Sequence, residues 1–199
     1  MATILRDDFD RFHDYGCLIK NRDIYFGSYT YYDDDSGETG VDFASTATLM
    51  KNLLYLDQLK NEKITIHFNS PGGEWSHGMA IFDLIKSLRS ITVFIGYGCV
   101  RSMGTIIMQA CNKRYLTPYC RFMIHMGTEG FYGHSEDFYR SSDEGRLITE
   151  QMYDIYLEKI KKNHPKFSRD KIKQLCSHDT YMSSPEAVKL GLADSILPY

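Results

Sequence analysis

The fold is decided by residues 63–95, which read KITIHFNSPGGEWSHGMAIFDLIKSLRSITVFI. Residues 63–68 alternate like a β-strand and stop at the turn sequence NSPGG of residues 69–73. Three apolar residues then follow at helical spacing: Met79, Phe82 and Ile85. A second strand-like run occupies residues 91–95. A strand, a helix and another strand in this order predict an α/β fold.

The same alternation continues on both sides of this stretch. Before it, we expect a strand at residues 23–26 and a helix whose leucines recur at three- and four-residue spacing: Leu49, Leu53, Leu56 and Leu59. After it, we expect a helix at residues 102–110 and a strand at residues 121–124. No linker, low-complexity tract or repeat divides the chain, so we expect a single domain over residues 1–199.

The longest periodic segment runs from about Asp143 to Lys162 and stops before Pro165, which cannot continue a helix. Its apolar stripe consists of Ile148, Met152, Ile155, Tyr156 and Ile160. Two interpretations remain open: the stripe packs on the chain's own sheet, or it serves association with another subunit.

The bulk composition excludes several classes of protein. The 199 residues carry a net charge of -3, which argues against a general nucleic-acid-binding surface. No apolar run is long enough for a membrane span, and the first residues resemble no signal peptide, so we expect a cytoplasmic protein. The cysteines are odd in number, widely spaced and without a Cys-x-x-Cys pair, which indicates reduced core thiols: Cys17, Cys99, Cys111, Cys120 and Cys176.

An acidic, turn-rich loop covers Asp33 to Glu38. Its spacing is not that of an EF-hand, so a solvated turn is favoured over a calcium site. The role of this loop stays open.

Four short segments contain residues suited to chemistry. The glycines of the NSPGG turn leave backbone amides exposed at a helix start, although such turns are commonly only turns. Ser102 lies between a strand and a helix, where it is either an N-cap or a nucleophile beside the positive helix end. His125 follows a strand, and Asp179 lies in a later polar segment. Taken singly, each has an ordinary structural interpretation.

The order serine, histidine, aspartate disfavours the common serine hydrolase architectures. An α/β-hydrolase places its acid before its histidine and its serine in Gly-x-Ser-x-Gly, which residues 100–104 are not. Chymotrypsin-like and subtilisin-like enzymes place serine last.

The ordered set of motifs resembles the proteolytic subunit of the ATP-dependent Clp protease (ClpP). That family shares the NSPGG turn, the Ser-Met-Gly serine at Ser102 and the Met-Ile-His segment ending at His125. It also shares the Ser-x-Pro-Glu-Ala helix start after Asp179 and the Gly-Leu-hydrophobic-Asp segment at residues 191–194. The resemblance spans roughly residues 11 to 197. It implies a crotonase-like fold with stacked βαβ units and a protruding handle helix at about residues 136–162, which interlocks two rings.

The resemblance also implies a mechanism and partners. Ser102 is then the nucleophile, His125 the general base and acid, and Asp179 the residue that orients the imidazole. The backbone amides of Gly73 and Met103 match the oxyanion hole. The implied activity is endopeptidase cleavage of unfolded polypeptides through an acyl-enzyme, without metal or organic cofactor. The implied assembly is a tetradecamer of stacked heptameric rings that receives substrate from an AAA+ ATPase of Clp type.

Departures from the family pattern leave other functions open. Met126-Gly127 replaces the usual Gln-Pro after His125, and Thr65 and His67 stand where the family tends to place tyrosines that receive the ATPase. Such divergence favours a phage-encoded or otherwise specialised homologue, with a dedicated capsid-maturation protease as one alternative. The others are an inactive structural or regulatory ring subunit, a crotonase-type acyl-CoA enzyme, and a Ser/Lys dyad using Lys113.

Overall fold

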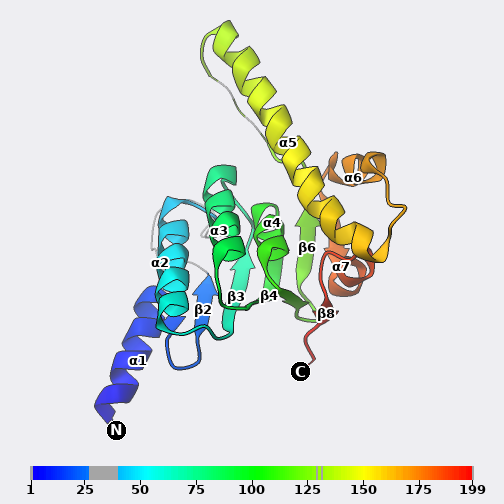
Figure 1. Ribbon diagram of the computed structural model, residues 1–199. Helices are drawn as coiled ribbons and strands as arrows, with labels where there is room; N and C mark the ends of the chain where they lie inside the picture. The colour runs from blue at the N-terminus through cyan, green and yellow to red at the C-terminus, as the bar shows by residue number, and fades with distance from the viewer. Residues whose placement is uncertain (1, 27–39, 129, 131, 199) are drawn as a thin grey trace.

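The computed structural model describes residues 2–26, 40–128, 130 and 132–198. Its strands are β1 (Cys17–Leu18), β2 (Asp23–Phe26), β3 (Ile64–Ser70), β4 (Thr92–Arg101), β5 (Lys113–Leu116), β6 (Arg121–Ile124), β7 (Thr180–Ser183) and β8 (Ser195–Ile196). Its helices are α1 (Ala2–Tyr15), α2 (Phe43–Leu59), α3 (Trp75–Ser87), α4 (Met103–Ala110), α5 (Ser135–Asn163), α6 (Arg169–Cys176) and α7 (Ser184–Leu190). Strands and helices alternate along much of the chain, and the strands form one mixed sheet (Figure 1). The predicted α/β fold is therefore confirmed.

The sheet is parallel through its centre and forks at β4. β2, β3, β4 and β5 pair in parallel, and the short β1 lies antiparallel to β2. Residues 93–96 of β4 pair with β5, whereas residues 99–101 pair with β6. β7 then pairs antiparallel with β6. The fork brings the end of β4, the end of β6 and the start of β7 to the same place, and this is where the candidate site lies.

The sequence predicts a strand only over residues 91–95, but β4 continues through Arg101. A Cβ added to Gly96 would lie 2.5 Å from Val100 Cγ2 and 2.7 Å from Leu116 Cδ2, so this glycine makes room for packing. Phe68 pairs with Gly96 and Ser70 with Val100, so β4 bulges between these two pairs. The strand is therefore longer at its end than the sequence predicts, and the bulge directs this end towards β6.

Helices α2, α3 and α4 lie side by side across one face of the sheet (Figure 1). The predicted leucine stripe of α2 is buried at Leu49, Leu53 and Leu56, whereas Leu59 is exposed at the helix end. In α3 the buried positions are Gly78, Ile81 and Ile85, with Met79 and Phe82 half-buried beside them. These side chains and the sheet's inner face form the core.

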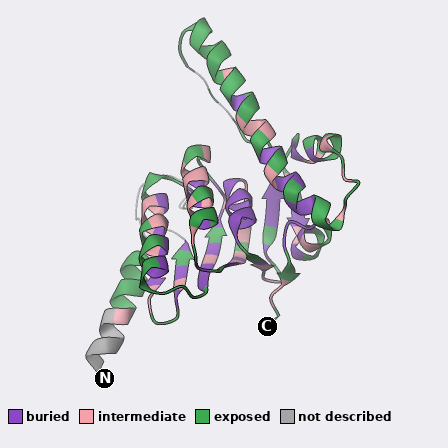
Figure 2. Ribbon diagram, viewed as in Figure 1, coloured by how far each residue is buried: buried purple, intermediate pink, exposed green. Residues whose placement is uncertain are grey.

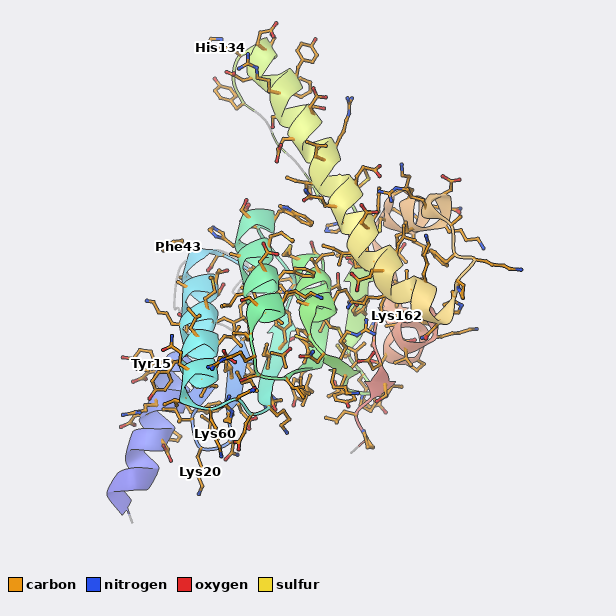
Figure 3. All side chains as sticks on the ribbon, viewed as in Figure 1. Tyr15, Lys20, Phe43, Lys60, His134 and Lys162 are labelled. Atoms are coloured by element: carbon orange, nitrogen blue, oxygen red, sulfur yellow. The ribbon has the colours of Figure 1, made fainter. Side chains whose placement is uncertain are left out.

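The long helix expected at about residues 136–162 is present as α5 (Ser135–Asn163). Figure 3 marks its two ends, with His134 at the far tip and Lys162 beside the body. Met152, Tyr156 and Ile160 are buried, so the second half of the stripe packs on the chain's own fold. The first half projects and is largely exposed (Figure 2). Within the described residues, no helix is long and apolar enough to cross a membrane.

Several short elements were not expected from the sequence: β5, β7 and α6. The predicted helix start at Ser183 is confirmed by a capping box with Glu186, and Gly191 ends α7 in the left-handed conformation at φ 88°. The acidic loop Asp33 to Glu38 lies outside the described residues.

All five cysteines are in the described part of the chain, and none forms a disulfide. Four of them are buried, and Cys99 is half-buried. Burial raises the pKa of the Cys111 thiol to about 12 and that of Cys17 to about 11. Buried neutral thiols of this kind pack as small apolar groups, as the spacing of the cysteines predicts.

Arg22 anchors the turn between α2 and β3. Its guanidinium donates to the carbonyl oxygens of Leu56, at 2.9 Å, and of Lys60, at 2.8 Å, and makes longer bonds to the carbonyls of Glu62 and Lys63. The residue is buried and adopts φ 59°, which costs a non-glycine residue energy. One cation therefore satisfies a carbonyl in the last turn of α2 and three carbonyls of the turn that leads to β3.

Arg22→Ala is expected to lower the free energy of unfolding by about 3 kcal/mol, because buried carbonyls lose a charged donor. Chemical denaturation at fixed protein concentration measures this. Lys51→Ala, which removes an exposed charge from α2, is the control and is expected to change stability by less than about 0.5 kcal/mol. An Arg22→Ala midpoint equal to that of Lys51→Ala would contradict the anchoring role.

Candidate active site

Ser102 lies at the junction of β4 and α4 in a backbone conformation that few residues adopt, with φ 48° and ψ −125°. Its amide donates to Met123 O at 2.9 Å, and its carbonyl accepts from the Thr105 amide at 2.9 Å. Such a conformation persists only where the surroundings fix it, and it is common at functional sites. It turns the chain sharply from strand into helix at the predicted nucleophile.

His125 is the first residue after β6, and its imidazole reaches Ser102. The distance from His125 Nε2 to Ser102 Oγ is 2.8 Å. Arg101 and Met123 are register partners in the parallel pair of β4 and β6. The residues just beyond this pair therefore emerge at the same end of the two strands.

Asp179 directly precedes β7, and its carboxylate meets the other side of the imidazole. The distance from Asp179 Oδ1 to His125 Nδ1 is 3.0 Å. Ile124 and Thr180 are register partners in the antiparallel pair of β6 and β7. Thr180 Oγ1 donates to Leu175 O at 2.6 Å, which ties this segment to α6. The Asp179 side chain is 53% exposed, whereas that of His125 is 20% exposed.

The hydrogen-bonding groups fix where the proton lies on the neutral imidazole. An ionised carboxylate only accepts, so His125 Nδ1 donates to Asp179. Nε2 is then the acceptor for the Ser102 hydroxyl. This is the tautomer that allows His125 to take a proton from Ser102.

The NSPGG turn packs against the serine. A Cβ added to Gly72 would lie 2.6 Å from Ser102 Cβ and 3.0 Å from Met103 N, so a side chain there is excluded. Gly73 follows at φ 152° and is held through Val41, whose amide donates to Gly72 O at 2.7 Å. Within the described residues, neither the Gly73 amide nor the Met103 amide donates a hydrogen bond. Two amides that donate to no described residue therefore belong to segments that meet at Ser102.

A cleft of about 510 Å³ opens onto these groups. Gly73, Ser102, Met103 and His125 all line it. Apolar side chains from three helices form part of its wall: Trp75, Ile106, Ile148, Met152 and Tyr156. The apolar stripe of α5 is predicted from the sequence, but its position beside Ser102 is not. Its signal was the four-residue spacing of Ile148, Met152 and Tyr156, which puts these three residues on one face of α5.

Two alternative arrangements receive no support from this geometry. Lys113 begins β5 and pairs with Val93, near the opposite end of β4 from Ser102, so the Ser102–Lys113 dyad is wrong. In the described ranges, no group of histidine, cysteine, aspartate and glutamate side chains is arranged to hold a metal ion.

Comparison with known proteins agrees with the resemblance seen in the sequence. The family model described as Clp protease matches residues 14–199. The chain belongs to the Clp protease family. A relative, the ATP-dependent Clp protease proteolytic subunit of Deinococcus radiodurans, is 30% identical over 186 residues, which cover 92% of this chain and 83% of the relative. The identity of 30% fits a divergent member of the Clp protease family.

Proposed function

We propose that the chain is a serine endopeptidase subunit that hydrolyses peptide bonds of unfolded polypeptides through an acyl-enzyme. The observation that carries this proposal is the continuous hydrogen-bonded chain from Asp179 through His125 to Ser102, open to a cleft. Membership of the Clp protease family supports the same reaction class.

In the acylation step, Ser102 Oγ attacks the carbonyl carbon of the scissile peptide bond, and His125 Nε2 accepts the hydroxyl proton. The tetrahedral intermediate carries a negative oxygen, for which the Gly73 and Met103 amides are the proposed donors. Asp179 stabilises the imidazolium ion. The C–N bond then breaks, and the amine leaves with the proton from Nε2. Water attacks the resulting ester by the same route and restores Ser102.

The cleft wall bears on which peptides are bound. Trp75 and Ile148 are half-buried and offer apolar surface to the cleft beside Ser102. An apolar substrate side chain seated there leaves water, which favours binding by about 1.5–3 kcal/mol for a full side chain. We therefore expect peptides with a large apolar residue next to the cleaved bond to be preferred substrates.

We further propose that the subunits form stacked heptameric rings, giving a cytoplasmic tetradecamer. Exposed apolar residues on the projecting half of α5 support association with a second copy: Phe138, Tyr139 and Leu147. The proposed partner is an ATPase of Clp type. Of the two residues that stand where the family places tyrosines, Thr65 is buried, whereas His67 lines a small cavity with Phe12 and Tyr25.

Labelling with a fluorophosphonate probe tests the proposed chemistry. We expect one covalent adduct per subunit, mapped to Ser102 by peptide mass spectrometry, because the probe reacts with a serine activated by a base. The labelled particle should lose hydrolysis of fluorogenic peptides in step with adduct formation. An assembled protein that neither labels nor hydrolyses peptides would be a structural or regulatory ring subunit instead.

A further inference from the structure

A buried hydrogen-bonded chain connects the long helix α5 to the backbone of Ser102. The Tyr156 hydroxyl, on α5, lies 2.6 Å from Thr105 Oγ1 on α4. Thr105 Oγ1 donates in turn to Ser102 O at 2.6 Å. Tyr156 and Thr105 are both fully buried. The mechanism described above uses neither hydroxyl.

The direction of this chain follows from its groups. A carbonyl oxygen can only accept, so the Thr105 hydroxyl donates its single proton to Ser102 O. Tyr156 must therefore donate to Thr105 Oγ1. Burial raises the pKa of Tyr156, which keeps the phenol protonated as this direction requires. A donor that itself accepts a hydrogen bond is polarised, which strengthens its bond to Ser102 O.

The Ser102 carbonyl is one of the two backbone groups that hold the strained residue. The amide side is fixed by Met123 O on β6, and the carbonyl side, among the described residues, by Thr105 through its amide and its hydroxyl. Rotation of the Ser102 backbone would move Oγ away from His125 and turn the neighbouring Met103 amide. Misplacement of a reacting group by about 1 Å costs on the order of 10²-fold in rate.

We propose that Thr105 and Tyr156 are positioning residues that hold the Ser102 backbone in its reactive conformation and join it to α5. This inference rests on the proposed peptidase function. These two hydrogen bonds make the alignment of Ser102 depend on the position of α5. The same helix carries the projecting half with its exposed apolar side chains.

Three variants test these hydrogen bonds one hydroxyl group at a time. Thr105→Val keeps the shape but loses the hydroxyl, and we expect kcat for peptide hydrolysis to fall about tenfold with little change in KM. Thr105→Ser restores the hydroxyl and should recover kcat to within about twofold. Tyr156→Phe leaves the Thr105 hydroxyl in place without its donor, so a smaller loss of about threefold is expected. Tyr153→Phe, the same change on the same helix, is the control and should leave kcat unchanged.

The rate and the final extent of fluorophosphonate labelling separate positioning from folding. Slow but complete labelling of Thr105→Val shows that every subunit is folded and that its serine is misaligned, which supports the inference. Labelling at the wild-type rate to a reduced extent means partial unfolding and overturns it, as does a Thr105→Ser variant no faster than Thr105→Val. Wild-type protein that does not label at all overturns the proposed function as well.

Discussion

Ser102→Ala is expected to lower kcat/KM for peptide hydrolysis by about 10⁶-fold and to abolish fluorophosphonate labelling. The reason is that Oγ is the only nucleophile placed 2.8 Å from His125 Nε2 among the described residues. The backbone should not move, because alanine keeps the Cβ that packs against Gly72 and retains the hydrogen bonds of the Ser102 amide and carbonyl groups. Residual hydrolysis of about 10³–10⁴ over water is expected from the oxyanion donors and substrate binding.

Ser87→Ala is the matched control for this variant. Ser87 is exposed at the end of α3, and its hydroxyl bonds only locally to Leu84 O. We expect unchanged labelling and hydrolysis in Ser87→Ala. The particle size of Ser102→Ala, measured by light scattering, should equal that of the wild type. Labelling of Ser102→Ala at the wild-type rate would mean that another residue is the nucleophile. The main support for the proposed mechanism would then be lost.

The positions of the chemical residues could be predicted, whereas their convergence could not be derived from local pattern. Ser102 and His125 each follow an apolar strand, and such strand ends carry functional groups in parallel sheets. What brings them together is the register in which Arg101 pairs with Met123 and Ile124 with Thr180. Register depends on contacts between distant segments, and only the resemblance to a family supplied it beforehand.

The elements that the sequence analysis missed are short or polar. β5 begins with Lys113 and Arg114. The Arg114 guanidinium is buried because tertiary partners satisfy it: Gln109, the Gly191 and Leu192 carbonyls, and Asp194. β7 has one buried residue, Met182, and exists through its pairing with β6. Neither segment has the alternation that marks an isolated strand. Tertiary contacts determine whether such segments form strands, whereas the long periodic segment of α5 is visible in the sequence alone.

Asp179→Asn is expected to lower kcat about 10³-fold with a small effect on KM. Asparagine is nearly the same size, and the bond from Thr180 Oγ1 to Leu175 O keeps the segment in place. The amide is neutral, so it stabilises the imidazolium less. Its NH₂ group can also donate to Nδ1, which leaves the proton on Nε2 facing Ser102. Replacing a buried triad aspartate by asparagine typically lowers kcat by about 10⁴-fold. The 53% exposure of Asp179 lets water take over part of its role, which reduces the loss.

Asp170→Asn removes the same charge from an exposed position on α6 and serves as the control. Its kcat should equal that of the wild type, which separates the bond to His125 from a general effect of net charge. The wild-type rate in Asp179→Asn would mean that water alone orients His125. A loss as large as that of Ser102→Ala would mean instead that Asp179 also holds the fold of the site, and chemical denaturation would then show reduced stability. A loss near 10³-fold at unchanged stability is the result that assigns Asp179 to orienting and stabilising the imidazole.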